Sequence, residues 1–92
     1  MKVYIAGRIT NEPNYEEKFE RAKAYLEAQG HVVLSPCILP KGLTPGDYIR
    51  ICLAMIDSAG MVYVLKNHQS SPGATIEVAY AKYGSKLIQF EK

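Results

Sequence analysis

The stretch SSPGATIEVAYAKYG, from Ser70 to Gly84, decides the fold that this sequence predicts. It has the start, the body and the end of one helix. Ser71 is a favoured N-cap residue, and Pro72 suits the first helical position, where no backbone N–H is needed. Gly84 suits a left-handed residue after the last turn. The body is almost wholly apolar, so we expect a helix that is buried on most sides.

Glu77 is the polar residue of this helix that cannot share a solvent-exposed face with the others. At about 100° per residue, Glu77 lies roughly 160° from Thr75 and roughly 140° from Lys82 around the helix axis. Thr75 and Lys82 can share a wet face, and Glu77 then points toward the protein or a cleft. A buried carboxylate costs free energy unless it is paired or does chemistry. The pattern leaves two readings of Glu77, a solvated residue or a functional carboxylate.

Composition predicts one small globular domain over residues 1–92, because the chain is short and 48% of its residues are hydrophobic. The net charge is only +2, and no basic run is interleaved with aromatic residues, so neither composition nor pattern favours nucleic acid as a partner. No apolar run is long enough to span a membrane, and no signal peptide precedes Met1. Cys37 and Cys52 lack the spacing of a zinc site. We therefore expect a cytoplasmic protein with two free thiols, no metal and no cofactor.

Strand and helix signals alternate along the chain. The expected strands are Lys2–Ala6, His31–Leu34, Gly60–Leu65 and Lys86–Phe90. The expected helices are one that Asn14 and Glu17 begin with a capping box and Gly30 ends, one from the cap Thr44 to about Ser58, and the Glu77 helix, which the polar loop Lys66–Gln69 precedes. This alternation predicts a four-stranded parallel sheet of order 2-1-3-4, in a small doubly wound, three-layer α/β fold of the flavodoxin or Rossmann kind.

The predicted fold places a ligand site at the carboxyl ends of the strands, where the strand order switches. The loops 7–10 and 66–73 meet there, and Glu77 lies just beyond them. The N–H groups near Gly73 open a helix N-terminus, which suits an anion such as a phosphate. Gly7 and Arg8 add a flexible turn and a guanidinium beside it. Ser71 and Gly73 therefore either bind an anion or only begin the helix.

Three other residues are candidates for contact with a ligand. Tyr4, in the first strand, either hydrogen-bonds a carboxylate in the cleft or belongs to the core. Asn67 and His68 lie in the polar loop before the Glu77 helix. His68 either acts as an acid or base near neutral pH or is solvated. No P-loop, GxGxxG fingerprint or Ser-His-Asp arrangement is present.

The segments KVYIAG, from Lys2 to Gly7, and SPGATIEVA, from Ser71 to Ala79, resemble the nucleoside 2-deoxyribosyltransferase superfamily. That superfamily includes the 2'-deoxynucleoside 5'-phosphate N-hydrolases. The likeness covers nearly the whole chain. It is greatest to a small bacterial and phage branch whose function is not established.

The resemblance implies a role for each matching residue. Glu77 matches the nucleophile, which attacks the anomeric carbon of the deoxyribose, and Tyr4 matches the tyrosine that positions it. Ser71 and Gly73 match residues that bind the 5'-phosphate in those members of the superfamily whose substrates are nucleoside 5'-phosphates. The resemblance also implies a homodimer or a larger homo-oligomer, for which tyrosines on partly buried helices would supply apolar surface. These are Tyr48, Tyr80 and Tyr83.

Three positions depart from the pattern of the superfamily. Cys52 occupies the place of an aspartate that helps to protonate the departing base, and Gly60 occupies the place of another aspartate. Arg8 replaces the usual serine after the first-strand glycine. Neither Asp47 nor Asp57 is placed to substitute for the missing acid.

The sequence thus favours a protein that binds a nucleoside or nucleotide and cleaves or transfers its N-glycosidic bond through Glu77. One alternative is a non-catalytic nucleotide-binding or sensor module that uses Glu77 to hold a ribose hydroxyl. Another is a small assembly protein with a vestigial cleft.

Overall fold

The computed structural model describes residues 1–92 and contains one sheet of four parallel strands in the order β2-β1-β3-β4. The predicted sheet and strand order are therefore confirmed. The elements along the chain are β1 (Lys2–Ala6), α1 (Tyr15–Ala28), β2 (Val32–Leu34), the short 3-10 helix η1 (Pro36–Ile38), α2 (Pro45–Ser58), β3 (Met61–Val64), the 3-10 helix η2 (Lys66–Ser70), α3 (Pro72–Tyr83) and β4 (Leu87–Phe90). None of the helices is long and apolar enough to cross a membrane.

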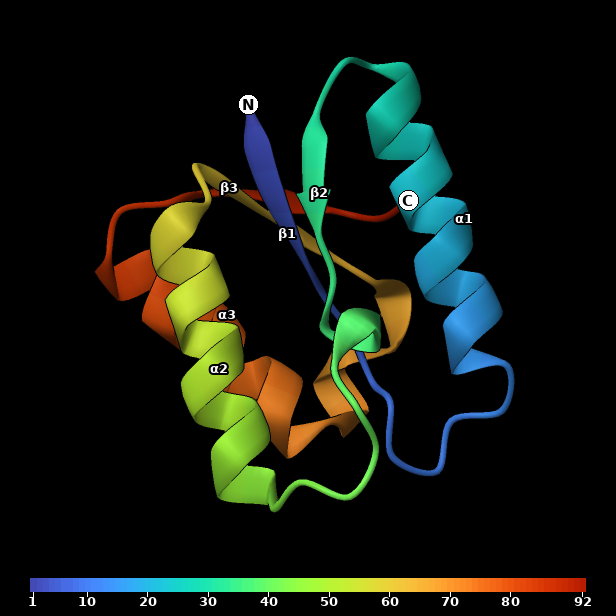
Figure 1. Ribbon diagram of the computed structural model, residues 1–92. Helices are drawn as coiled ribbons and strands as arrows, with labels where there is room; N and C mark the ends of the chain where they lie inside the picture. The colour runs from blue at the N-terminus through green and yellow to red at the C-terminus, as the bar shows by residue number, and fades with distance from the viewer.

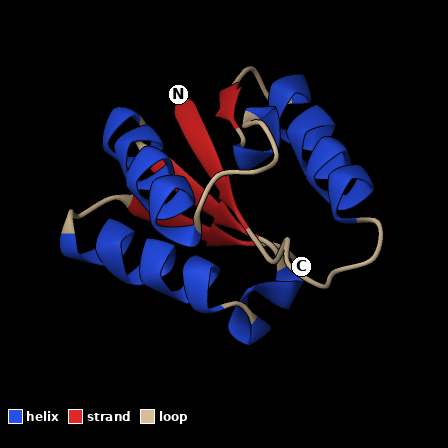
Figure 2. Cartoon of the chain, turned by 60° about the horizontal axis from the view of Figure 1, so that its bottom comes forward, coloured by secondary structure: helices blue, strands red, loops and turns tan.

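Helices cover both faces of the sheet, with α1 on one face and the pair α2 and α3 on the other (Figures 1 and 2). The side chains of β1 alternate between these two layers. Val3 and Ile5 pack under α1, whereas Tyr4 and Ala6 pack under α2 and α3. Because both faces are covered, the central strands β1 and β3 are almost continuous apolar runs.

The carboxyl ends of β1 and β3 meet at one edge of the sheet, as the strand order predicts. Just beyond β3, the N–H of Leu65 donates to the carbonyl of Ala6 at 2.8 Å. The N–H of Arg8 then donates to Oδ1 of Asn67 at 3.0 Å, which ties the loop after β1 to η2. The segment Lys66–Gln69, predicted as loop, forms most of η2. Helices α2 and α3 both begin near this edge (Figure 1).

The predicted cap of α2 is confirmed, and the predicted cap of α1 is wrong. Thr44 Oγ1 accepts from the N–H of Asp47 at 3.1 Å, and Asp47 Oδ2 accepts from the N–H of Thr44 at 3.0 Å. Asn14 instead adopts a left-handed conformation with φ 58° and makes no side-chain cap. A side chain caps best from extended backbone, so the left-handed turn removes that geometry from Asn14.

The start of α3 is as predicted, but its end differs. Ser71 Oγ accepts from the N–H of Ala74 at 3.2 Å, and Pro72 is the first helical residue. Gly84, predicted to be left-handed, has φ −81°, and Ser85 takes the positive φ of 59° instead. The chain therefore reverses toward β4 one residue later than the glycine suggested.

Helix α3 is also less buried than its composition indicated. Glu77 is buried while Thr75 and Lys82 are exposed, so the predicted orientation is confirmed. However, three large apolar side chains are also exposed: Ile76 (49%), Tyr80 (37%) and Tyr83 (92%). The expectation of burial on most sides was wrong because α3 lies in an outer layer, where α2 and the sheet cover only part of its surface. The predicted oligomer stays a prediction.

The close approach of Gly7 to Leu65 gives a test of this packing. A Cβ at position 7 would lie 2.6 Å from Leu65 Cδ1 and 3.0 Å from Leu65 Cβ. We expect Gly7→Ala to lower the free energy of unfolding by roughly 1–3 kcal/mol, the usual cost of overpacking, in a denaturant titration. Gly60→Ala is the matched control, because its Cβ would meet nothing closer than 3.7 Å. Equal stability of the two variants would contradict this packing.

Candidate active site

Glu77 is a buried carboxylate held by a residue from the opposite end of the chain. It lies in the second turn of α3, and only 7% of its surface is exposed. The hydroxyl of Tyr4, a fully buried residue of β1, donates to Glu77 Oε2 at 2.9 Å. The structure therefore brings together the two residues that the sequence nominated as catalytic. Tyr4 is a core residue and a partner of the carboxylate at the same time.

Cys52 joins this pair from a third element. It lies in α2, is 3% exposed, and its thiol interacts with both Tyr4 and Glu77. Both cysteines of the chain are free. Three elements, β1, α2 and α3, thus each contribute one protonatable group to the same buried cluster.

Burial sets the charge of this cluster. It raises the pKa of Glu77 to about 7, and the hydrogen bonds from Tyr4 and Cys52 lower that pKa only in part. Burial is also the main reason why the pKa of Tyr4 lies well above its usual value and why the pKa of Cys52 rises to about 11. At neutral pH, Tyr4 and Cys52 therefore stay protonated and the Tyr4 hydroxyl donates to Glu77, while Glu77 can gain or lose its proton. Such a carboxylate can serve as a nucleophile, a base or an acid.

The N-terminus of α3 lies one turn before Glu77. Ser71 caps it, so the hydroxyl of Ser71 already has a structural role. Gly73 is not demanded by packing, because an added Cβ would meet only Ile49 Cδ1 and Ser71 Oγ, both at 3.9 Å. Its φ also lies outside the region that favours glycine. Neither packing nor backbone conformation therefore requires glycine at this position.

Arg8 and Asn67 hold the loops at this edge together. Arg8 Nε donates to the carbonyl of Thr10 at 2.9 Å, so its guanidinium folds back on its own loop. No hydrogen bond joins Arg8 to Ser71 or Gly73. Asn67 uses its side-chain oxygen on the Arg8 N–H rather than on the α3 terminus. The structure thus brings loops 7–10 and 66–73 together without yet placing the Arg8 side chain at the start of α3.

His68 is separated from Glu77 by α3 itself. Its Nδ1 lies 2.9 Å from the carbonyl of Leu65, and its ring packs 5.6 Å from the ring of Phe90. It lines a cavity of about 410 Å³ together with Thr75 and Lys82. Those two residues mark the face of α3 opposite Glu77. His68 is therefore not brought to the Tyr4–Glu77 pair.

The two aspartates nearest in sequence to Cys52 are both engaged away from Glu77. Asp47 completes the cap of α2 and pairs with Arg50 at 2.8 Å. Asp57 accepts from the hydroxyl of Tyr80 at 2.8 Å, at the far end of α2. No hydrogen bond brings either carboxylate to Glu77, so the cluster holds a thiol and a phenol rather than a second acid.

The fold and this cluster define a parallel α/β protein with a buried glutamate near the carboxyl edge of its sheet. The chain belongs to the family described as Domain of unknown function (DUF4406), whose model matches residues 1–90. A comparison with curated proteins gives no match.

Two solved structures show where this fold recurs. The 2-deoxyribosyltransferase from Leishmania mexicana has a TM-score of 0.76 and 19% sequence identity, over 97% of this chain and 62% of that one. The 2-deoxyribosyltransferase from Bacillus psychrosaccharolyticus has a TM-score of 0.78 and 21% identity, over 98% of this chain and 71% of that one. This chain thus has a nucleoside 2-deoxyribosyltransferase-like fold. It spans less than two thirds of the length of the Leishmania structure.

The raised pKa of Glu77 predicts an unusual dependence of stability on pH. The native state keeps the proton of Glu77 up to about pH 7, whereas the unfolded chain releases it near pH 4.5. The native state therefore binds more protons within this window, and stability falls as the pH rises through it. Complete ionisation of the buried group should cost on the order of 3 kcal/mol.

Glu77→Gln removes this titration while keeping the shape of the side chain. We expect the variant to match the wild type near pH 4.5 and to exceed its free energy of unfolding by up to about 3 kcal/mol at pH 8. Denaturant titrations across pH 4 to 8 measure the difference. Parallel curves for the two proteins would show that Glu77 titrates normally. Glu27→Gln, on the exposed side of α1, is the control.

Proposed function

We propose that this protein binds a deoxynucleoside or its 5'-monophosphate at the carboxyl edge of the sheet and cleaves or transfers the N-glycosidic bond through Glu77. The observation that carries the proposal is the buried Glu77 carboxylate that accepts from Tyr4 at 2.9 Å. A buried carboxylate with a pKa of about 7 is expensive to keep without chemistry. The fold, which this chain shares with the two 2-deoxyribosyltransferases, supports the same function.

In the proposed reaction, an oxygen of Glu77 forms a bond to the anomeric carbon as the bond from that carbon to the base nitrogen breaks. The base leaves with the electron pair of the broken bond and takes a proton from solvent. The transition state resembles an oxocarbenium ion, which a carboxylate stabilises. Water then attacks the glycosyl-enzyme, which releases the sugar and restores the carboxylate. A second base in place of water gives transfer instead of hydrolysis.

Cys52 favours a second candidate function, a binding or sensor module without catalysis. Its thiol keeps its proton until about pH 11, so it is a poor donor to a departing base. Tyr4 is no better, because burial also raises its pKa. In this reading, Glu77 and Tyr4 hold a hydroxyl of the sugar and the N-glycosidic bond stays intact.

Base release separates these two functions. We expect slow release of free base from a panel of deoxynucleosides and their monophosphates, fastest where the base leaves easily, with a rate that increases with pH toward a plateau above 7 as Glu77 ionises. Glu77→Gln should abolish it. Chromatography of the free base measures both results. Retained activity in Glu77→Gln would remove Glu77 as the nucleophile, and binding without any release would favour the sensor.

Cys52→Asp tests the missing acid. A carboxyl there should gain a raised pKa from its neighbour Glu77 and protonate the base, with an increase toward the ~10²–10⁴-fold range typical of general-acid catalysis. Cys52→Asn is the matched control, since it has the same shape and no acidic proton. An equal rate in the two variants would contradict a missing acid at this position.

The start of α3 is proposed to hold the 5'-phosphate. We expect Ser71→Ala to weaken binding of a deoxynucleoside monophosphate by roughly 1 kcal/mol or more, the scale of one charge-assisted hydrogen bond. Arg8→Ala should do the same if its side chain turns from Thr10 to the ligand. Calorimetric titration measures both affinities, and Ser70→Ala is the neighbouring control. Unchanged affinity in both Ser71→Ala and Arg8→Ala would exclude this site.

A further inference from the structure

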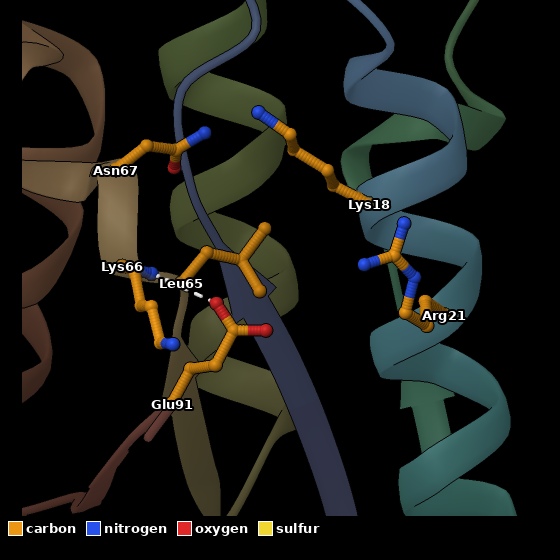
Figure 3. A pocket seen from close by; sticks show the side chains of 6 residues that line it. All are labelled: Lys18, Arg21, Leu65, Lys66, Asn67 and Glu91. Carbon is orange, nitrogen blue, oxygen red and sulfur yellow. Dashed lines mark hydrogen bonds between the residues drawn. The ribbon is translucent and has the colours of Figure 1, made fainter.

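A cavity of about 240 Å³ lies at the same edge of the sheet but on the α1 side (Figure 3). Its lining comes from three separate segments: Lys18 and Arg21 of α1; Leu65, Lys66 and Asn67 after β3; and Glu91 after β4. Leu65, only 2% exposed, belongs to the apolar layer under α1, whereas Tyr4 belongs to the layer under α2 and α3. The sheet therefore separates this cavity from the Tyr4–Glu77 pair.

Positive charge dominates the lining, with three cations against one carboxylate. Arg21 has only a 3.3 Å contact with Glu17, and about 70% of both side chains is exposed. Such a pair contributes little to stability, so the guanidinium is free to bind another anion. Lys66 makes no ion pair, while Lys18 is shared with Glu12. At least two of the three cations are therefore available to a ligand.

The remaining polar groups suit hydroxyls rather than a second anion. Glu91 accepts from the N–H of Lys66 at 3.0 Å through Oε1, which leaves Oε2 as an acceptor. Asn67 is engaged on both sides, since its Oδ1 accepts from the Arg8 N–H and its side chain also hydrogen-bonds the Glu12 carboxylate. Figure 3 shows Lys18 reaching toward Asn67 from α1, and Arg21 lying across from the carboxylate of Glu91. Arg21 and Lys66 therefore lie at the same end of the cavity as the Glu91 carboxylate, so cations and a hydroxyl acceptor are offered side by side.

We propose that this cavity binds a small phosphorylated polyol, such as a sugar phosphate. The phosphoryl group would accept from Arg21, Lys18 and Lys66, as phosphates do from guanidinium and ammonium groups. Sugar hydroxyls would donate to Glu91, and Leu65 would contact the carbon skeleton. The volume is several times the roughly 30 Å³ that one water occupies, which suits a ligand of this size. This site is independent of the proposed N-glycosidic reaction.

Glucose 6-phosphate is the probe for this site. Glucose alone and inorganic phosphate alone are the control ligands, because each carries one of its two functional parts. We expect saturable binding of glucose 6-phosphate, weaker binding of inorganic phosphate and none of glucose. On addition of glucose 6-phosphate, the backbone NMR chemical shifts of Lys66, Asn67 and Glu91 should change. The chemical shift of Glu77 should not. Absence of saturable binding, or shifts confined to the start of α3, would overturn the proposal.

Two variants locate the charges. Arg21→Gln should lower the affinity for glucose 6-phosphate by about tenfold, because it removes one charge-assisted hydrogen bond. Arg50→Gln is the matched control, because its side chain is as exposed as that of Arg21, 72%, and also lies in a surface ion pair. Equal affinities in these two variants would overturn the proposal.

The hydroxyl contact and the independence of the site are tested separately. Glu91→Gln should increase the affinity for inorganic phosphate and reduce the preference for glucose 6-phosphate over it, and an unchanged preference would overturn the hydroxyl contact. Ser71→Ala should leave the affinity for glucose 6-phosphate unchanged. A loss of affinity for glucose 6-phosphate in Ser71→Ala would show that the ligand binds at the start of α3. That result would overturn the separate site, whether or not the chain cleaves nucleosides.

Discussion

The hydrogen bond from Tyr4 to Glu77 is the constraint on which the candidate site depends. It spans 73 residues of sequence and joins the first strand to the third helix inside the apolar layer. A buried carboxylate without a donor would cost several times more than a typical hydrogen bond contributes. The tyrosine hydroxyl and the Cys52 thiol limit that cost, and no fully buried polar side-chain atom lacks a partner. These contacts therefore offset part of the free-energy cost of burying an ionisable group in an apolar core.

Much of the fold is readable from local sequence, because the signals agree with one another. The apolar runs of β1 and β3 require helices on both faces, and the strand and helix alternation then determines the parallel topology. The angular position of Glu77 relative to Thr75 and Lys82 predicts which way its side chain points. Each of these inferences uses periodicity, which tertiary packing here preserves.

The errors have a common physical origin, since they depend on contacts or backbone conformations that local patterns do not specify. Asn14 is a residue type that often caps helices, but its backbone here has a left-handed conformation. The apolar body of α3 predicts burial on most sides, whereas its place in an outer layer leaves Ile76 and Tyr80 exposed. The place of His68, beside Phe90 and on the face of α3 that carries Thr75 and Lys82, depends on tertiary contacts of the same kind. The cavity beside α1 is lined by residues from three separate segments, so no single sequence motif predicts it.

Cys52 explains how a single carboxylate can stay responsive near neutral pH in this core. An aspartate at that position would place two carboxyl groups in one buried cluster, and their mutual repulsion would push the pKa of one of them further up. A thiol with a pKa of about 11 adds no charge at neutral pH, so burial alone raises the pKa of Glu77. The residue beside Glu77 therefore decides the charge of the carboxylate, because a neutral neighbour leaves burial as the cause that raises the pKa of Glu77.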